Sequence, residues 1–338
     1  MTITHKENTM NSSALLRLTL VGIITALFVT GLIAYSKSRG YTKMEEPASD
    51  TEAASSVDGT SRRYEKSFTV KEGGEVNVEA DAGTVKIDSW DKNEVSVVIE
   101  VEGSDSRAEK YQVEFRQEGN TVYVTGKVKD KSFFKWNVGN LAAYYTIYTP
   151  KKFNTKVNTS GGNVESKNLV GRSDLTTSGG NVRVEKLEGE TLLSTSGGNV
   201  DALEVKGNVE AETSGGNVFL ENIVGNVKGH TSGGDVEFNG VDGRVQGGTS
   251  GGNVTVNVTG ENKGIDVETS GGDIEIFIKE GIGADVDAET SGGSVDCDLP
   301  VTVRGKVRDS ELHGKINGGG NVLRASTSGG SIRIAALK

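Results

Sequence analysis

Two aspartates in the second half of this chain come nearest to an enzymatic arrangement. Asp235 and Asp273 each follow a Thr-Ser-Gly-Gly motif, at a place where most other copies of the motif carry Asn. If the copies stack as successive coils, the two carboxylates lie two coils apart, at about 10 Å. That distance is too long for a retaining glycosidase and marginal for an inverting one. A glycan-active enzyme therefore stays a second alternative that lacks a defined pair of catalytic carboxylates.

Nucleophiles and metal ligands are sparse. His5, His230 and His313 have no serine at a spacing that suggests a catalytic triad, and Glu212 beside His230 resembles a surface contact. The single cysteine, Cys297, stands in an alternating apolar stretch, where we expect it to be buried and unreactive. Calcium-binding nonapeptide repeats need an aspartate in every repeat, and this chain usually has Asn there. We predict no enzymatic activity, no cofactor and no metal site.

Aromatic side chains concentrate in one segment, Phe133–Tyr148, with the sequence FFKWNVGNLAAYYTIY. Such rings can cover the open end of a repeat array, which needs a cap. They can also form an exposed platform for a sugar or a partner protein. The candidate partner-binding residues are Phe133, Phe134, Trp136, Tyr144, Tyr145 and Tyr148.

A long repeat array follows this segment. Thr-Ser-Gly-Gly recurs every 18 residues at first and then at slightly longer intervals; the copies begin at Thr159, Thr177, Thr195, Thr213, Thr231, Thr249, Thr269 and Thr290. A diverged copy, Asn317–Gly320, and a last one at Thr327 close the series. A fixed period of this size is typical of a solenoid. We predict a right-handed parallel β-solenoid over 156–338, with about nine or ten coils.

The pattern within one repeat predicts two short strands per coil. Counted from its Thr, position 6 is Val or Ile in every copy, including Val322 in the diverged one, and position 8 is mostly apolar and includes Cys297. Both positions should face the interior, with polar residues between them facing out. Glycine at positions 3, 4 and 13 should form sharp corners. Thr and Asn columns should hydrogen-bond from coil to coil.

Four segments precede the array. Residues 64–155 alternate between apolar and polar side chains and predict a β-rich capping region. Residues 18–35 are uncharged and mainly apolar, which predicts a transmembrane signal anchor after a cytoplasmic segment, 1–17. Cleavage after an Ala-Tyr-Ser stretch at residues 34–36 is the alternative. The polar segment 36–63 should be a disordered linker.

Charge and composition limit the kinds of partner that we expect. The formal net charge is −10, and most of it belongs to the repeat array, so a nucleic-acid partner is not expected. One cysteine excludes an internal disulfide framework. The apolar N-terminal segment implies contact with a membrane.

The order of these features resembles a bacterial family of β-strand-repeat envelope proteins that have been proposed as adhesins. The matching segments are FTVKEGGEVNVEADAGTVKI at Phe68–Ile87, YTIYTPKKF at Tyr145–Phe153, the Thr-Ser-Gly-Gly-Asn-Val repeats, and GKINGGGNV at Gly314–Val322. The resemblance covers about 64–338. It implies an extracytoplasmic β-solenoid on a membrane anchor, which in some members is associated with envelope-stress systems.

We therefore expect a non-enzymatic cell-membrane protein with one spanning helix and its C-terminal domain outside the cytoplasm. Its solenoid would serve adhesion or contact with an envelope protein or a surface glycan. The first alternative is a structural scaffold that self-associates, because the ends of a solenoid are exposed sheet edges.

Overall fold

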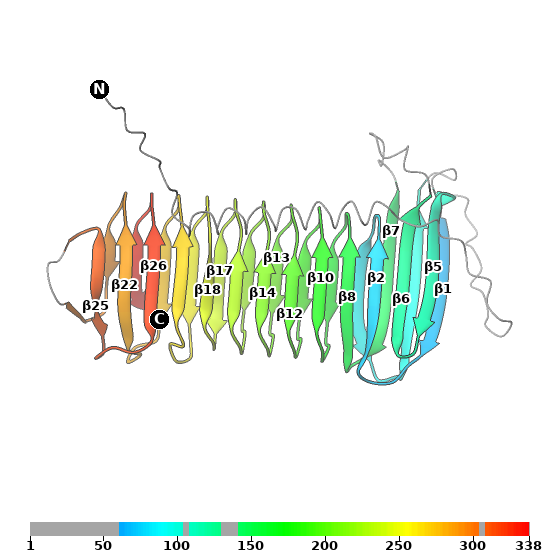
Figure 1. The fold of residues 1–338 in the computed structure, drawn as a ribbon, viewed down its shortest axis with the longest axis horizontal. Coiled ribbons are helices and arrows are strands. Elements are labelled where there is room, and N and C mark those ends of the chain that lie inside the picture. The colour runs from blue at the N-terminus through cyan, green and yellow to red at the C-terminus, as the bar shows by residue number, and fades with distance from the viewer. Residues whose placement is uncertain (1–60, 104–107, 130–140, 304–307, 338) are drawn as a thin grey trace, which may run out of the picture. The chain divides into compact units, whose positions relative to one another are not determined.

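The computed structural model describes residues 61–103, 108–129, 141–303 and 308–337, and its elements there are all β-strands (Figure 1). The segments predicted as cytoplasmic (1–17), transmembrane (18–35) and linker (36–63) lie outside the described residues, except for the last three residues of the linker. Within the described part of the chain, no helix is long and apolar enough to cross a membrane.

The strands form two sheets, A and B. Sheet A has 13 strands, in the spatial order β1 (Ser61–Thr69), β4 (Glu94–Glu102), β7 (Ala142–Pro150), β3 (Thr84–Trp90), β9 (Val164–Lys167), β11 (Val182–Glu185), β13 (Val200–Leu203), β15 (Val218–Glu221), β17 (Val236–Val241), β19 (Val254–Val258), β21 (Ile274–Ile278), β27 (Ile332–Ala336) and β23 (Val295–Cys297).

Sheet B has 14 strands, in the order β24 (Val301–Val303), β25 (Glu311–Ile316), β22 (Ala284–Thr290), β26 (Val322–Thr327), β20 (Ile265–Thr269), β18 (Val245–Thr249), β16 (Val227–His230), β14 (Val209–Glu212), β12 (Thr191–Ser194), β10 (Ser173–Thr177), β8 (Phe153–Thr159), β2 (Gly74–Ala80), β6 (Thr121–Val128) and β5 (Tyr111–Glu118).

Each repeat contributes one strand to each sheet, and equivalent strands pair in parallel. Val200 of β13 pairs with Val182 of the preceding coil and Val218 of the following one, so the 18-residue period becomes the stacking register. Inward residues at positions 6 and 8 are buried in most coils. The prediction of an all-β fold with stacked parallel strands is confirmed.

Side-chain hydrogen bonds run along the stack in two ladders. Each motif threonine donates to a glycine carbonyl of the neighbouring coil, as from Thr213 Oγ1 to Gly198 O at 2.8 Å. Each motif asparagine accepts a backbone N–H of the next coil, as Asn199 Oδ1 does from Asn217 N at 2.9 Å. These bonds satisfy polar groups at the corners and make the Thr and Asn columns structural.

The interior is narrow, and large and small side chains compensate for each other across it. Phe238 of sheet A is fully buried, and its ring lies about where side chains at Gly229 and Gly247 of sheet B would extend. A Cβ on Gly247 would come within 2.8 Å of the Phe238 ring. The two glycines therefore make room for this one large ring.

The C-terminal coil does not stack last. Strands β26 and β27 lie between β20–β21 and β22–β23, so the end of the chain inserts between two earlier coils. In Figure 1, the red β26 lies beside the orange β22, next to the yellow strands. Sheet B then continues by antiparallel pairing, with β25 beside β22 and β24 beside β25.

This insertion corrects one part of the predicted register. Residues Asn317–Gly320 form the turn from β25 to β26 and are no repeat corner, because β26 belongs to sheet B. Val322 is therefore 47% exposed, and the next residue, Leu323, faces the interior instead. A second correction concerns position 3 in the earlier coils, where the corner does not require glycine for lack of space: a Cβ on Gly215 would find its nearest atom at 3.6 Å.

The N-terminal end repeats the same arrangement. Strands β2 and β3 form a parallel coil that lies between β6–β7 and β8–β9, although β6 and β7 come later in the chain than β2 and β3. Beyond them, β4 and β1 extend sheet A, and β5 extends sheet B, all by antiparallel pairing. Antiparallel strands thus cover the parallel coils at this end.

Candidate functional site

The residues of the predicted aromatic segment differ in where the structure places them. Phe133, Phe134 and Trp136 lie outside the described residues. Tyr144 and Tyr148 point outward from β7 and are 43% and 40% exposed. Tyr145 is only 1% exposed, so its assignment as a partner-binding residue is wrong.

Tyr145 faces inward because neighbouring residues of a strand point to opposite sides of the sheet. Its hydroxyl meets the hydroxyl of Tyr111, which donates to the carbonyl of Ala82 at 2.9 Å. Gly126 lies against the Tyr145 ring end, where a Cβ would overlap the phenol oxygen. Tyr145 therefore belongs to the core of the N-terminal coils.

A half-buried tryptophan outside the predicted segment lies beside these exposed tyrosines. Trp90, at the end of β3, stacks on Tyr148 with ring centroids 5.4 Å apart and an interplanar angle of 22°. The Nζ of Lys92 lies 4.2 Å from the centroid of the Trp90 ring, and Trp90 Nε1 donates to Glu94 O at 2.7 Å. We call Trp90, Tyr144 and Tyr148 the aromatic patch. The sequence signal for Trp90 was the alternation of β3, which places it on the outward face.

Polar groups border the aromatic patch on the same face of sheet A. Asp88 lies opposite Tyr148 on the neighbouring strand and accepts from Asn168 Nδ2 at 2.8 Å. Glu100 lies opposite Tyr144 and accepts from Arg63 at 2.9 Å. The patch thus combines exposed ring faces with fixed hydrogen-bonding groups, an arrangement suited to a ligand that has both apolar and hydroxyl surfaces.

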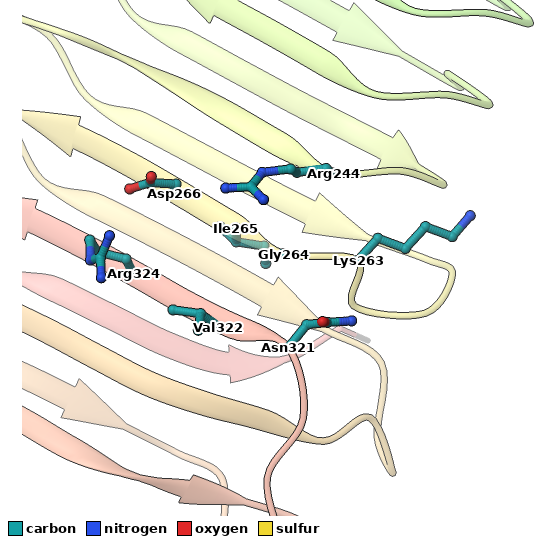
Figure 2. Close-up of a pocket in the computed structure, with 8 residues that line it drawn as sticks. All are labelled: Arg244, Lys263, Gly264, Ile265, Asp266, Asn321, Val322 and Arg324. Carbon is teal, nitrogen blue, oxygen red and sulfur yellow. The ribbon is translucent and has the colours of Figure 1, made fainter.

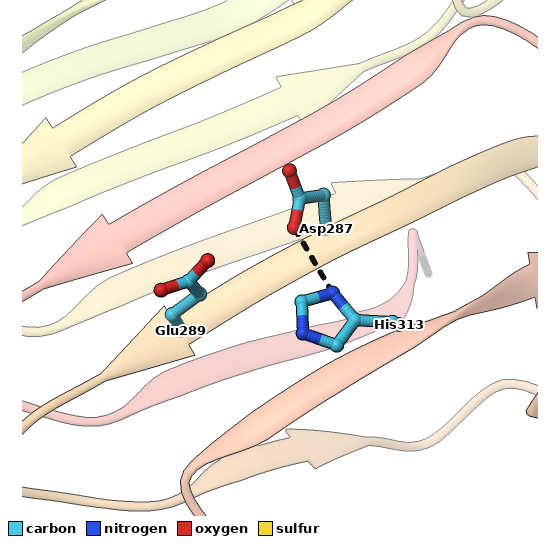
Figure 3. A group of neighbouring side chains, drawn as sticks. All are labelled: Asp287, Glu289 and His313. Carbon is cyan, nitrogen blue, oxygen red and sulfur yellow. Dashed lines mark ion pairs between the residues drawn. The ribbon is translucent and has the colours of Figure 1, made fainter. Parts of the chain in front are cut away.

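A second group of functional side chains is found near the C-terminal end of sheet B. Asp287 and Glu289 on β22 face His313 on β25, and their nearest ligand atoms all lie within 4.8 Å of one another (Figure 3). His313 Nδ1 lies 3.0 Å from Asp287 Oδ1, while Arg324 Nε lies 3.2 Å from Asp287 Oδ2. Asp287 therefore already has two cationic or protonatable neighbours, and it forms a surface ion-pair network with His313 and Arg324.

The sequence did not bring this trio together, because β22 and β25 meet by antiparallel pairing outside the regular repeat. The other acidic candidates have structural roles. Asp235 Oδ1 accepts from Asn253 N at 2.7 Å, and Asp273 Oδ1 accepts from Ser331 N at 2.7 Å, so both carboxylates replace asparagine in the corner ladder. Neither is placed as a catalytic acid.

Comparison with known families decides the assignment. The sequence matches the family model described as Toastrack DUF4097 over residues 66–335. The chain belongs to the Toastrack family. This confirms the resemblance that the repeats and the flanking segments indicated. No protein of curated function matches this Toastrack chain in sequence.

Three solved structures are similar to the Toastrack chain over 82% of its length. A proposed adhesin from Bacteroides fragilis is 17% identical, with 97% of that chain covered and a TM-score of 0.39. A proposed lipid-binding protein from Parabacteroides distasonis is 13% identical, with 97% covered and a TM-score of 0.39. A proposed cell adhesion protein from Clostridium sporogenes is 13% identical, with 100% covered and a TM-score of 0.23.

The one cysteine of this Toastrack chain is less buried than its repeat position predicted. Cys297 is half-buried, because β23 is the last of the described strands in sheet A. Its Sγ lies 3.5 Å from Leu299 O. Burial raises the pKa of the Cys297 thiol, and the Asp298 carboxylate acts in the same direction. The thiolate, which is the reactive form, is therefore disfavoured.

Proposed function

We propose that this Toastrack chain is a non-enzymatic, membrane-anchored surface protein that contacts a partner through the aromatic patch. The observation that carries the proposal is the outward stack of Trp90 on Tyr148, with Tyr144 exposed on the same strand face. Large aromatic rings exposed on a protein surface commonly mark interaction sites. The candidate carboxylates, Asp235 and Asp273, are occupied in the corner ladder, which supports a role without catalysis.

The proposed partner is a surface glycan. Tyr144 and Tyr148 are four residues apart on one strand, or about 13 Å, and each can present a ring face to the apolar side of a sugar. Asp88 and Glu100 hold hydrogen-bonding oxygens beside the two tyrosines and would serve sugar hydroxyls. A protein partner would more commonly require a broader apolar centre than these rings offer.

The experiment compares wild type with a Tyr144→Ser/Tyr148→Ser variant of the full chain in detergent on a glycan array. A Tyr123→Ser variant is the matched control, since Tyr123 faces out from sheet B with Arg116 4.1 Å from its ring centroid. We expect glycan binding that only the double variant loses. If the array shows no glycan binding, and wild type captures an envelope protein that the double variant does not capture, the partner is a protein and not a glycan. Binding unchanged in the double variant would show that the patch is not the contact.

The anchor and the location are part of the proposal. The support is the uncharged apolar run 18–35, followed by a polar segment, together with the membership of the chain in the Toastrack family. Fractionation of intact cells should find the protein in the membrane, and protease added to spheroplasts should cut within 40–62. Release into the medium would indicate a cleaved signal peptide, and full protection would place the solenoid in the cytoplasm.

The scaffold alternative makes a different prediction. The end formed by β1 and β5 carries many charged side chains, among them Arg62, Arg63, Glu114 and Arg116, and charged edge strands disfavour edge-to-edge pairing. We therefore expect one discrete species in size-exclusion chromatography at all concentrations, whereas polymers that grow with concentration would favour a scaffold. A link to envelope stress is tested by measuring expression of the gene under cell-wall antibiotics.

A further inference from the structure

A small pocket of about 230 Å³ lies on the outer face of sheet B, where the inserted C-terminal coil meets β20 (Figure 2). Pairing of Val245 with Ile265, and of Ile265 with Leu323, sets the preceding residues side by side as Arg244, Gly264 and Val322. The middle residue of this row has no side chain. The pocket is therefore the space that a side chain at Gly264 would otherwise occupy.

Gly264 is held in place by a departure from the regular repeat. The coil that begins at Thr249 is two residues longer than the 18-residue coils before it. The longer segment is fixed by a reciprocal pair: Asn262 Nδ2 donates to Asn321 O at 2.7 Å, and Asn321 Nδ2 donates to Asn262 O at 2.8 Å. Asn262 is 6% exposed, and its Oδ1 accepts from Gly264 N at 2.9 Å. The backbone of the pocket is thus held by buried hydrogen bonds.

Two arginines and one aspartate surround the pocket. Arg244 lies over Gly264, with its side-chain carbons 3.7–3.9 Å from the position of a Cβ there, and Figure 2 shows its guanidinium directed along β20 toward Asp266. Asp266 pairs in register with Arg324 on β26. Lys263 points away and bonds to Asp242 at 2.7 Å.

The charge of Arg244 is not balanced by an ion pair with any carboxylate of the described residues. Arg324 is bound only through its Nε, to Asp287 at 3.2 Å, so its two terminal nitrogens have no partner among the ion pairs of the described chain. An arginine has five N–H donors, and it commonly binds a carboxylate or a phosphate through two parallel hydrogen bonds. These two guanidinium groups face a common space in a protein whose net charge is −10.

We propose that this pocket binds a carboxylated sugar of the uronic acid type. Arg244 and the free nitrogens of Arg324 would bind the carboxylate, and Asp266 would accept hydrogen bonds from ring hydroxyls. Val322, 47% exposed, offers an apolar contact for the sugar ring. A phosphate fits less well, because its second negative charge would lie close to Asp266. The proposal is independent of the aromatic patch, which belongs to sheet A.

The test measures binding of glucuronate, glucose and inorganic phosphate to the full chain in detergent, by ligand-observed NMR titration. We expect glucuronate to bind more tightly than either of the others. Arg244→Gln should weaken glucuronate binding about tenfold, the loss typical of a charge-assisted hydrogen bond. Asp266→Asn removes the negative charge that opposes phosphate, so it should strengthen phosphate binding and reduce the preference for glucuronate over phosphate.

Arg183→Gln is the matched control, because Arg183 is an outward residue of sheet A that pairs with Asp201 at 3.6 Å. It should leave glucuronate binding unchanged, and circular dichroism should show that all three variants fold. No glucuronate binding, an Arg244→Gln variant that binds as wild type does, or phosphate binding tighter than glucuronate binding would each overturn the proposal.

Discussion

The hydroxyl of Thr327 donates a hydrogen bond of 2.9 Å to the carbonyl of Gly272, which precedes it by 55 residues. In the regular coils the same bond spans 15 residues. The next bond of this ladder runs from Thr290 Oγ1 to Gly330 O, so here the acceptor comes 40 residues later in the chain than the donor. The side chains of the repeat motif thus form one continuous ladder across the inserted coil, although the chain does not reach its coils in order.

Deletion of residues 321–338 should therefore destabilise two neighbouring coils and not one. The segment buries Leu323, Ile332 and Ile334, each worth about 1.5–3 kcal/mol, and it bridges β20–β21 to β22–β23. We expect amide hydrogen exchange to lose protection throughout β22–β25, while β8–β17 keep theirs. A Leu323→Ala/Ile332→Ala variant should show the same pattern more weakly. Wild-type protection in β22 and β23 after the deletion would contradict the insertion.

Two adjacent glycines of one repeat corner should respond differently to alanine. A Cβ on Gly216 would overlap the carbonyl of Gly198 in the neighbouring coil, whereas a Cβ on Gly215 would have its nearest atom at 3.6 Å. Gly216→Ala should lower the free energy of unfolding by about 1–3 kcal/mol through overpacking. Gly215→Ala should change it by less than about 0.5 kcal/mol. Urea unfolding of both variants measures this difference. Equal losses would mean that the corner is set by backbone freedom and not by coil contact.

The regular part of the fold was predictable because its contacts follow from the repeat period and from the alternation within each strand. An 18-residue offset puts identical residues side by side, and alternation within each strand decides which of them face the core. Val200 and Val218 therefore lie where the pattern placed them. The ladder partners are also local, since each Thr or Asn bonds to the next coil.

The ends could not be predicted in the same way. Insertion of β26–β27 depends on pairing between residues far apart in sequence, and no periodicity encodes it. Val322 was misplaced for this reason, and the pocket beside it was missed. Trp90 was missed because its partner Tyr148 is 58 residues away, beyond the reach of any local pattern. Tyr145, by contrast, could have been placed correctly, because strand alternation forbids two adjacent tyrosines from sharing a face.

Ser166 offers a stabilising substitution. It takes the inward position 8, where it pairs with Ile87 and Val184 on the two neighbouring strands. It is fully buried, and its Oγ has no hydrogen-bond partner among the described residues. An unpaired buried hydroxyl costs about 1–3 kcal/mol, so Ser166→Ala should raise the free energy of unfolding by about 1 kcal/mol. Ser173 is the control, because its Oγ accepts from Thr155 Oγ1 at 3.1 Å, and Ser173→Ala should destabilise. Thermal melts with the opposite order would show that Ser166 has a partner in solution.

Cys297 should react slowly for a half-exposed thiol. Burial raises its pKa, so at pH 8 less of the reactive thiolate is present than in a free cysteine. Because the chain has one cysteine, labelling by a chromogenic disulfide reagent reports on this site alone. We expect a rate at least about tenfold below that of the urea-unfolded chain, with a pH profile whose midpoint lies above the ordinary thiol pKa.

The raised pKa of Cys297 also means that the folded state holds the thiol proton more tightly than the unfolded state does. The contribution of the Cys297 thiol to stability is therefore fully present below the ordinary thiol pKa. It is lost as the pH rises through the pKa of the thiol in the folded state. A Cys297→Ser variant should lack this component of the pH dependence. Labelling as fast in the folded as in the unfolded chain would show that β23 does not cover the thiol.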